Sequence, residues 1–119
     1  MWLSEADADL LASILDYINR VESHIDRFGD SYASYVGNIA FQDSTILCVI
    51  QIGEKSKRLS EEFKARYPEI KWRELAGMRD KLVHNYAVFD PEIGWDAIKN
   101  HLPQLKGVCL QELDEHEAD

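Results

Sequence analysis

The feature that most limits the fold of this chain is an apolar stripe with helical spacing in its N-terminal part. Its members recur at three-, four- and seven-residue steps: Leu3, Leu10, Ile14, Tyr17, Val21, Ile25 and Phe28. Such spacing lies along one face of an α-helix and not along a strand. Ser4 is placed to cap the start of this helix, and Gly29 is placed to end it. The chain is therefore predicted to begin with a long amphipathic helix that buries one face.

The middle of the chain also has helical character. A turn or two of helix is expected over 30–36, and a long helix is expected over 41–65. The centre of the long helix, 46–50, is apolar on all sides, so it needs cover from other helices or from a second subunit. A further helix is expected over 72–86.

A last helix is expected to begin at Pro91, because proline is well suited to a first helical turn. It carries apolar residues at Trp95, Ile98, Leu102, Leu105 and Leu110. Pro103 is expected to kink or split this helix, and its acidic end, 112–119, is expected to fray. No β-alternating run, internal repeat or low-complexity stretch occurs. The pattern predicts one all-α domain over residues 1–119, an antiparallel bundle of four to five helices.

Composition argues against several classes of protein. No apolar run reaches the roughly 18 residues of a membrane span, and 1–7 has no basic stretch followed by an apolar one, as a secretory signal would. Cys48 and Cys109 lie among apolar neighbours and are expected to be reduced. Three histidines are scattered without the spacing of metal ligands: His24, His101 and His116. We therefore expect a cytoplasmic protein with no metal, cofactor or membrane attachment.

The net charge of −9 argues against extensive nucleic-acid binding, because cations drive the binding of a polyanion. The charges are unevenly distributed, however. Nine of the 13 cations lie between Lys55 and Lys81, where five acids reduce their sum to +4, while the rest of the chain sums to −13. A cationic strip on an acidic body can hold a ligand that carries phosphate. The same charges also fit two helices with mixed, solvated faces.

Arg79 breaks the pattern of the helix expected over 72–86. On an ideal helix Arg79 lies ~40° from Leu75 and ~20° from Tyr86, so it projects from the apolar face. An unpaired arginine is costly in such a position. Arg79 therefore needs an acidic partner in a structural salt bridge, a cleft, or a second subunit.

His84 follows Arg79 by five residues, which is ~140° round a straight helix. A distorted helix end or a second copy of the chain would bring the histidine and an arginine together. Asp80, four residues before His84, is placed to hold one ring nitrogen and set the tautomer. A cap or surface role for His84 fits the same position. Gly77 costs the helix ~1 kcal/mol relative to alanine, which a close backbone approach or simple tolerance would explain.

The octet 79–86, Arg-Asp-Lys-Leu-Val-His-Asn-Tyr, resembles the R-x4-6-H-x-Y signature of HEPN ribonucleases. The spacer between arginine and histidine has four residues here. A polar residue, Asp80, follows the arginine, as is common in that family.

The resemblance extends to both sides of the octet. The segment 52–54 is similar to the Ile-Gly-Glu element of the HepT-like branch, and 68–72 is similar to its Pro-x-Ile-Pro-Trp element. Lys71 replaces the second proline of that element. The segment 86–95 is similar to the branch's exit from the motif helix. The likeness covers about residues 5–110.

The resemblance implies an all-helical homodimer whose two motif helices meet at the interface and form a shared cleft. HepT-like proteins act as toxins that cut RNA without a metal, in type VII-like toxin–antitoxin systems. Their antitoxin is a minimal nucleotidyltransferase that silences the toxin by transferring AMP to the motif tyrosine, which matches Tyr86. The expected partners are a second copy of the chain, this nucleotidyltransferase and RNA, and not DNA or a membrane.

Metal-free RNA cleavage needs a base, an acid and positive charge beside the phosphorus. Arg79 suits the charge, because its guanidinium stays protonated and matches phosphate oxygens. His84 suits proton transfer, because an ordinary histidine has a pKa of about 6.5, and two copies would supply both base and acid. Asp80 is expected to orient Arg79 or His84. Lys81 and Arg73 are candidate phosphate contacts.

Tyr86 has a structural and a regulatory interpretation. It either packs its ring and hydrogen-bonds its hydroxyl, or it carries AMP whose phosphate competes with RNA at Arg79. Two other functions stay open. One is a non-catalytic HEPN dimer that binds a nucleotide or the nucleotidyltransferase, which the net charge of −9 favours. The other is a structural helical subunit in which Arg79 forms a salt bridge.

Overall fold

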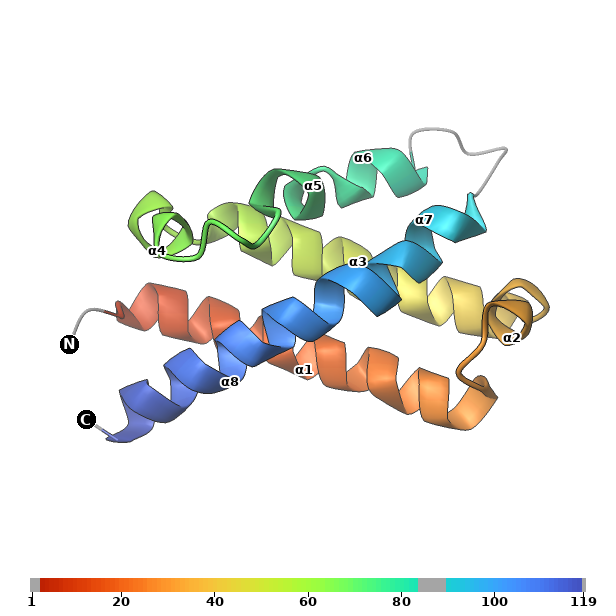
Figure 1. Cartoon of the computed structure of the whole chain (residues 1–119), viewed down its shortest axis with the longest axis horizontal. Helices are drawn as coiled ribbons and strands as arrows, with labels where there is room; N and C mark the ends of the chain where they lie inside the picture. Colours follow the sequence, from red (N-terminus) through yellow and green to blue (C-terminus); the bar gives the residue numbers. More distant parts are fainter. Residues whose placement is uncertain (1–2, 84–89, 119) are drawn as a thin grey trace.

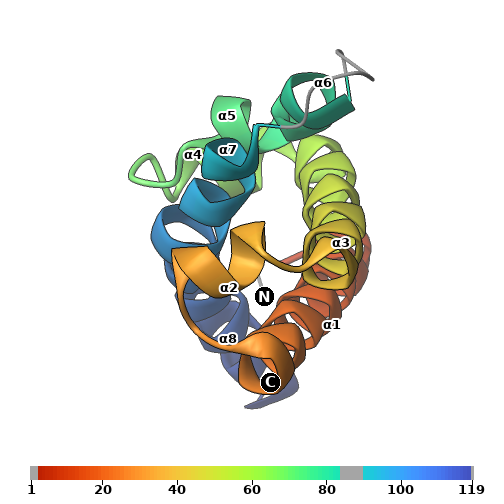
Figure 2. The ribbon, with the colours of Figure 1, turned by 90° about the vertical axis from the view of Figure 1, so that its right-hand side faces the viewer.

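The computed structural model describes residues 3–83 and 90–118, and these residues form helices joined by short connections (Figure 1). The elements are α1 (Glu5–Phe28), α2 (Tyr32–Val36), α3 (Ile39–Arg58), α4 (Glu61–Ala65), α5 (Trp72–Ala76), α6 (Met78–Val83), α7 (Pro91–Asp96), the π-helical turn η1 (Ala97–His101) and α8 (Leu102–Ala118). Viewed from one end, α1, α3 and the α7–α8 run surround a common centre, and α5 and α6 close the remaining side (Figure 2). The predicted all-α bundle is confirmed.

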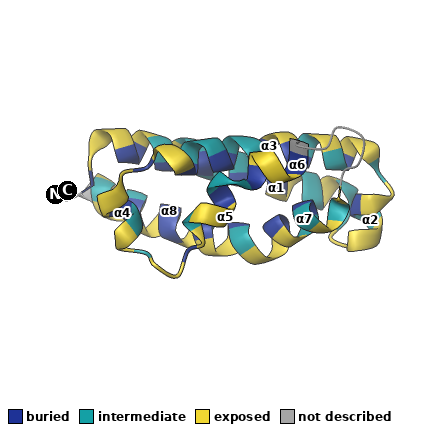
Figure 3. Cartoon of the chain, turned by 90° about the horizontal axis from the view of Figure 1, so that it is seen from above, coloured by how far each residue is buried: buried dark blue, intermediate teal, exposed yellow. Residues whose placement is uncertain are grey.

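Helix α1 has the boundaries that its sequence predicts. The Ser4 hydroxyl accepts a hydrogen bond from the Asp7 backbone N–H at 3.0 Å, and Gly29 ends the helix with a φ of 113°, which favours glycine. The core face of α1 is fully buried between α3 and α8: Leu11, Ile14, Ile18 and Val21. Leu11 and Ile18 were not in the predicted stripe, and four of its members are only half-buried: Leu10, Tyr17, Ile25 and Phe28. Figure 3 shows the burial of each residue along the helices.

The expectation of one helix over 41–65 is wrong, because α3 ends at Arg58 and α4 begins after Ser60. The Ser60 hydroxyl caps α4 by accepting from the Phe63 N–H at 3.1 Å. Ser60 also donates from its backbone N–H and its hydroxyl to the Asp7 carboxylate, at 3.0 and 2.6 Å. The break therefore ties the start of α1 to the junction of α3 and α4.

The helix expected over 72–86 is also interrupted, in this case at Gly77 between α5 and α6. The Trp72 indole N–H fixes the start of α5 by donating to the backbone carbonyls of Lys64 and Tyr67, at 3.1 and 3.0 Å. At the other end of α5, Gly53 of α3 lies directly against the Leu75 carbonyl, where a Cβ on residue 53 would overlap it.

The last helical run is widened and not broken by Pro103. Proline has no N–H to donate, and the preceding turn η1 is π-helical, with the Leu102 N–H bonded to the carbonyl of Ala97. The expectation that 112–119 frays is wrong for most of that segment, because α8 continues to Ala118. Leu110, expected in the core, is 43% exposed.

None of the helices in the described part of the chain is both long and apolar enough to cross a membrane. The two cysteines, Cys48 and Cys109, are buried and free, as predicted. Burial raises the pKa of both thiols, that of Cys109 to about 12. Neither cysteine is therefore a thiolate near neutral pH, and the sulfur atoms act as core-packing groups.

Replacing Gly53 with alanine is expected to lower the free energy of unfolding by about 1–3 kcal/mol, because the added methyl overlaps the Leu75 carbonyl. The matched control is Gly107→Ala in α8, where an added Cβ meets nothing within 4 Å. That change should raise stability by up to about 1 kcal/mol. Urea unfolding followed by circular dichroism measures both, and equal effects would contradict the contact.

Candidate functional site

The prediction that Arg79 projects from the apolar face is wrong. Helix α6 meets α3 through Met78 and Leu82, which are four residues apart and both buried. Arg79 lies about 100° round the helix from Met78 and is exposed. Because Gly77 separates α5 from α6, the angle from Leu75 to Arg79 on one ideal helix does not apply.

The other described residues of the predicted site lie on the same outer side of the fold. Asp80 and Lys81 are exposed on α6, and Arg73 is exposed on α5. Within residues 3–83 and 90–118, none of these side chains, nor that of Arg79, has an ion pair or hydrogen bond. The structure thus places four predicted site residues on two consecutive short helices. His84 and Tyr86 lie outside the described residues, so their roles stay predictions.

The cations of the chain divide into two groups. Five of the 13 form ion pairs with carboxylates: Arg20, Lys64, Arg66, Lys99 and Lys106. The other eight have no ion pair with any described residue, and seven of them lie in the strip predicted from sequence: Lys55, Lys57, Arg58, Lys71, Arg73, Arg79 and Lys81. Unneutralised positive charge is therefore concentrated at the end of α3 and along α5 and α6.

Two sequence elements beside the motif have structural roles that fix where α6 stands. Gly53, in the Ile-Gly-Glu element, allows α5 to lie on the backbone of α3. Trp72, at the end of the element 68–72, anchors α5 to the connection after α4. These residues therefore position the motif helix.

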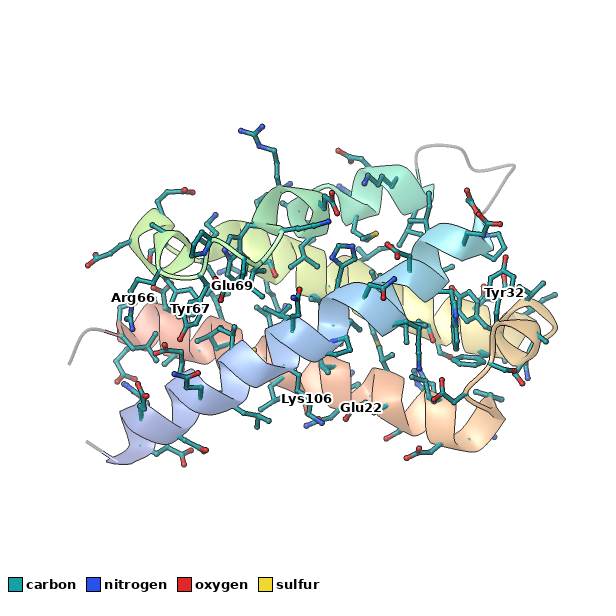
Figure 4. All side chains as sticks on the ribbon, viewed as in Figure 1. Glu22, Tyr32, Arg66, Tyr67, Glu69 and Lys106 are labelled. Atoms are coloured by element: carbon teal, nitrogen blue, oxygen red, sulfur yellow. The ribbon has the colours of Figure 1, made fainter. Side chains whose placement is uncertain are left out.

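A buried carboxylate, missed from the sequence, joins α8 to the connection after α4, which carries Arg66 and Tyr67 (both labelled in Figure 4). The Glu112 side chain is 1% exposed, and its Oε1 accepts from the Tyr67 hydroxyl and lies 3.5 Å from the Arg66 guanidinium. Burial and the hydrogen bond to Glu112 raise the pKa of Tyr67 far above its usual value. Only the helical spacing of Glu112 from Cys109 and Leu105 hinted at its inward orientation.

The three other histidines lie apart from one another. Burial, followed by the charge of Arg27, lowers the pKa of His24, and His116 lies 3.0 Å from the Glu5 carboxylate. His101 lies 3.4 Å from both Glu74 and Asp96. Among the described residues no group of three or more side chains is arranged to hold a metal ion.

A family model described as ribonuclease HepT-like matches residues 14–111, so the chain belongs to this branch of the HEPN superfamily. It is 33% identical to the "Probable ribonuclease HepT" of Thermococcus cleftensis over 105 residues, which are 88% of this chain and 94% of that protein. It is 33% and 32% identical to two proteins of Methanocaldococcus jannaschii, each named "Putative RNase", over 82% and 81% of this chain and 85% and 78% of theirs. No solved structure gives a significant match to the chain.

Proposed function

We propose that this chain is a metal-independent endoribonuclease whose cleft is completed by a second copy of the chain. The observation that carries the proposal is the exposed Arg79, which lies among the chain's unneutralised cations on a helix fixed by Gly53. Membership of the HepT-like family supports it, as do the relatives named as ribonucleases.

In the proposed reaction, Arg79 binds the scissile phosphate and offsets the negative charge that grows on it. His84 of one copy takes the proton from the ribose 2′-hydroxyl, and His84 of the other gives a proton to the departing 5′-oxygen. The 2′-oxygen forms a bond to phosphorus as the bond to the 5′-oxygen breaks. The products are a 2′,3′-cyclic phosphate and a 5′-hydroxyl. Asp80 orients Arg79 or His84, and Lys81 and Arg73 contact neighbouring phosphates.

The second copy is proposed to pack on the outer face of α3. Ile39 and Leu47 are 74% and 59% exposed and lie ~80° apart on that helix, with the exposed Asp43 between them and the half-buried Ile50 one turn beyond Leu47. This face lies on the helix against which α6 packs, and a two-fold axis beside it is proposed to bring two copies of α6 together.

Regulation by AMP transfer is the finer part of the proposal, and it rests on the family and on Tyr86. The tyrosine oxygen attacks the α-phosphorus of ATP, pyrophosphate leaves, and the hydroxyl proton passes to a base of the nucleotidyltransferase. The attached phosphate carries one negative charge. Beside Arg79 it would compete with RNA for the same guanidinium.

A non-catalytic dimer that binds nucleotide or the nucleotidyltransferase is the second candidate. The observation that favours it is the net charge of −9, because a nuclease that binds long RNA is usually more basic. Nucleotide binding without RNA cleavage under any condition would favour this function over the first.

The purified protein is expected to cleave RNA in EDTA and to leave a 2′,3′-cyclic phosphate. Arg79→Ala and His84→Ala should each reduce the rate by about 10²-fold or more, because each removes charge or proton transfer from the transition state. Arg27→Ala is the matched control, since Arg27 is exposed and lies at the far end of α1. Full activity in both motif variants, with circular dichroism unchanged, would remove the site assignment.

Leu47→Asp is expected to convert the protein from a dimer to a monomer and to abolish cleavage, because it places a charge in the proposed apolar interface. Leu110→Asp is the control, since Leu110 is 43% exposed on α8, away from α3. Sedimentation equilibrium gives the mass of each. A Leu47→Asp protein that keeps the dimer mass would rule out this interface.

Co-expression with a minimal nucleotidyltransferase of the antitoxin type that the family resemblance implies is expected to add one or more AMP units to the intact mass of this chain. The Tyr86→Phe variant should lack the addition, because it has no acceptor oxygen at this position. An unchanged mass beside a nucleotidyltransferase shown to be active would count against regulation through Tyr86.

A further inference from the structure

A polar cleft lies on the side of α5 that faces the π turn, away from α3. Its volume is about 540 Å³, within the range of sites that hold small molecules. Six side chains line it: Lys71, Glu74, Asp96, Asn100, His101 and Gln104. In the end view, α5 stands above the α7 side of the bundle and α6 stands above α3, so the cleft and Arg79 flank the same pair of short helices (Figure 2).

The π turn before Pro103 assembles the far wall of this cleft. In an ordinary α-helix, residues five apart point ~140° away from each other, but a wider turn brings them closer in angle. His101 Nε2 accordingly lies 3.4 Å from Asp96 Oδ2, and the Asn100 amide donates to Asp96 Oδ1 at 2.6 Å. Both carboxylate oxygens of Asp96 are therefore held from within the turn.

Glu74 forms the facing wall from α5, with its Oε2 3.4 Å from His101 Nε2. The His101 side chain is only 10% exposed, and its Nε2 lies between the Glu74 and Asp96 carboxylates. Glu74 is 46% exposed, and Gln104 is exposed with its amide unbonded within the described structure. The cleft thus presents a solvent-exposed carboxylate, Glu74, and a solvent-exposed amide, Gln104, to a ligand that displaces their water.

The charges of the cleft select the kind of ligand. His101 lies between the Glu74 and Asp96 carboxylates at the floor of the cleft, and the two carboxylates repel a phosphate group there. A neutral, planar ligand that presents N–H donors matches the Glu74 oxygens, and a carbonyl on the same edge matches the Gln104 amide. Lys71 at the lip provides a cation for a phosphate attached to such a ligand.

We infer that the cleft between α5 and the π turn binds a nucleobase of the RNA substrate, with guanine favoured. Guanine presents two neighbouring N–H donors, at N1 and N2, beside its O6 acceptor. Glu74 accepts from the two donors, Gln104 donates to O6, and Lys71 holds the adjoining phosphate. Arg73 is exposed on α5 next to Glu74 and Arg79 is exposed on α6, so these two cations mark the direction in which the strand continues from this base toward the proposed cleavage site. The inference rests on the proposed ribonuclease function.

The test measures binding of each of the four ribonucleoside 5′-monophosphates to the full chain. Binding is monitored through the NMR signals of the His101 ring. GMP is expected to shift these signals and to bind at least several-fold more tightly than UMP. Glu74→Gln should weaken GMP binding by roughly tenfold, the effect of losing a charged hydrogen bond. Its matched control is Glu92→Gln, at an exposed glutamate of α7 outside the cleft.

Glu74→Gln could weaken GMP binding by moving α5, so a second pair of variants changes residues of α8 instead. Gln104→Ala should weaken GMP binding, whereas Gln111→Ala, at an exposed glutamine two turns further along α8, should not. Equal binding of all four nucleotides, no shift at His101, or unchanged GMP affinity in Glu74→Gln and Gln104→Ala would each overturn the inference.

The two proposals fail in different ways. If the protein cuts RNA in EDTA but does not bind GMP at His101, the proposed base subsite is wrong and the proposed ribonuclease function stands. If the protein binds GMP at this cleft but cuts no RNA, the proposed ribonuclease function is wrong. The proposed role of the cleft in RNA cleavage is then wrong as well.

Discussion

The contact between Gly53 of α3 and the Leu75 carbonyl of α5 determines how the cationic side of this fold is arranged. Two helices approach this closely only where one of them lacks a side chain. Trp72 ties the start of α5 to α4 and the connection after it, and Gly53 of α3 lies against the end of α5, so this five-residue helix is fixed at both ends. Helix α6 begins only one residue after α5 ends, so the placement of α5 also fixes where α6 starts. Arg79 of α6 then faces outward.

The distribution of ion pairs determines the electrostatic surroundings of the outward-facing Arg79. The pairs of Lys99 with Asp30 and of Lys106 with Glu22 link the C-terminal run to the α1 side of the fold, at 2.7 Å each. A cation that is paired with a carboxylate contributes little to the electrostatic field at a distance, because the two charges offset each other. The cations left over lie mainly on α5, α6 and the end of α3. A chain of net charge −9 therefore keeps one region able to attract a phosphate, while the rest of its surface repels one.

Local signals in the sequence predicted what local interactions decide. Ser4 and Gly29 bound α1 as expected, because a cap and a positive φ depend only on neighbouring residues. The breaks at Ser60 and Gly77 were not predicted. Ser60 is held by Asp7, which is 53 residues away, and the course of α5 depends on α3. Glu112 was misjudged for the same reason, since its partners Tyr67 and Arg66 come from the connection after α4.

The residues of the candidate site remain predictions from the sequence, and the geometry predicted for Arg79 was wrong. The resemblance singled out Arg79, and a straight-helix angle then gave it the wrong face, because the angle assumed a continuous helix through Gly77. His101 shows the opposite case. Its spacing from Asp96 indicates separation on an ordinary helix, and Pro103 was expected to kink or split the helix, not to change its register.

The π turn and the break at Gly77 have a common consequence. At the π turn, the departure from an ideal helix turns His101 toward the cleft. At Gly77, the break in the helix turns Arg79 toward solvent. Helix α5 lies between the two, with Glu74 on its cleft side and Arg73 exposed beside it. Because α5 is fixed at its start by α4 and the connection after it and at its end by α3, it cannot shift toward one side without disturbing the other. An RNA strand bound across α5 would thus meet a preset spacing between base recognition and phosphate contact, and the rigid α3 beneath would maintain it.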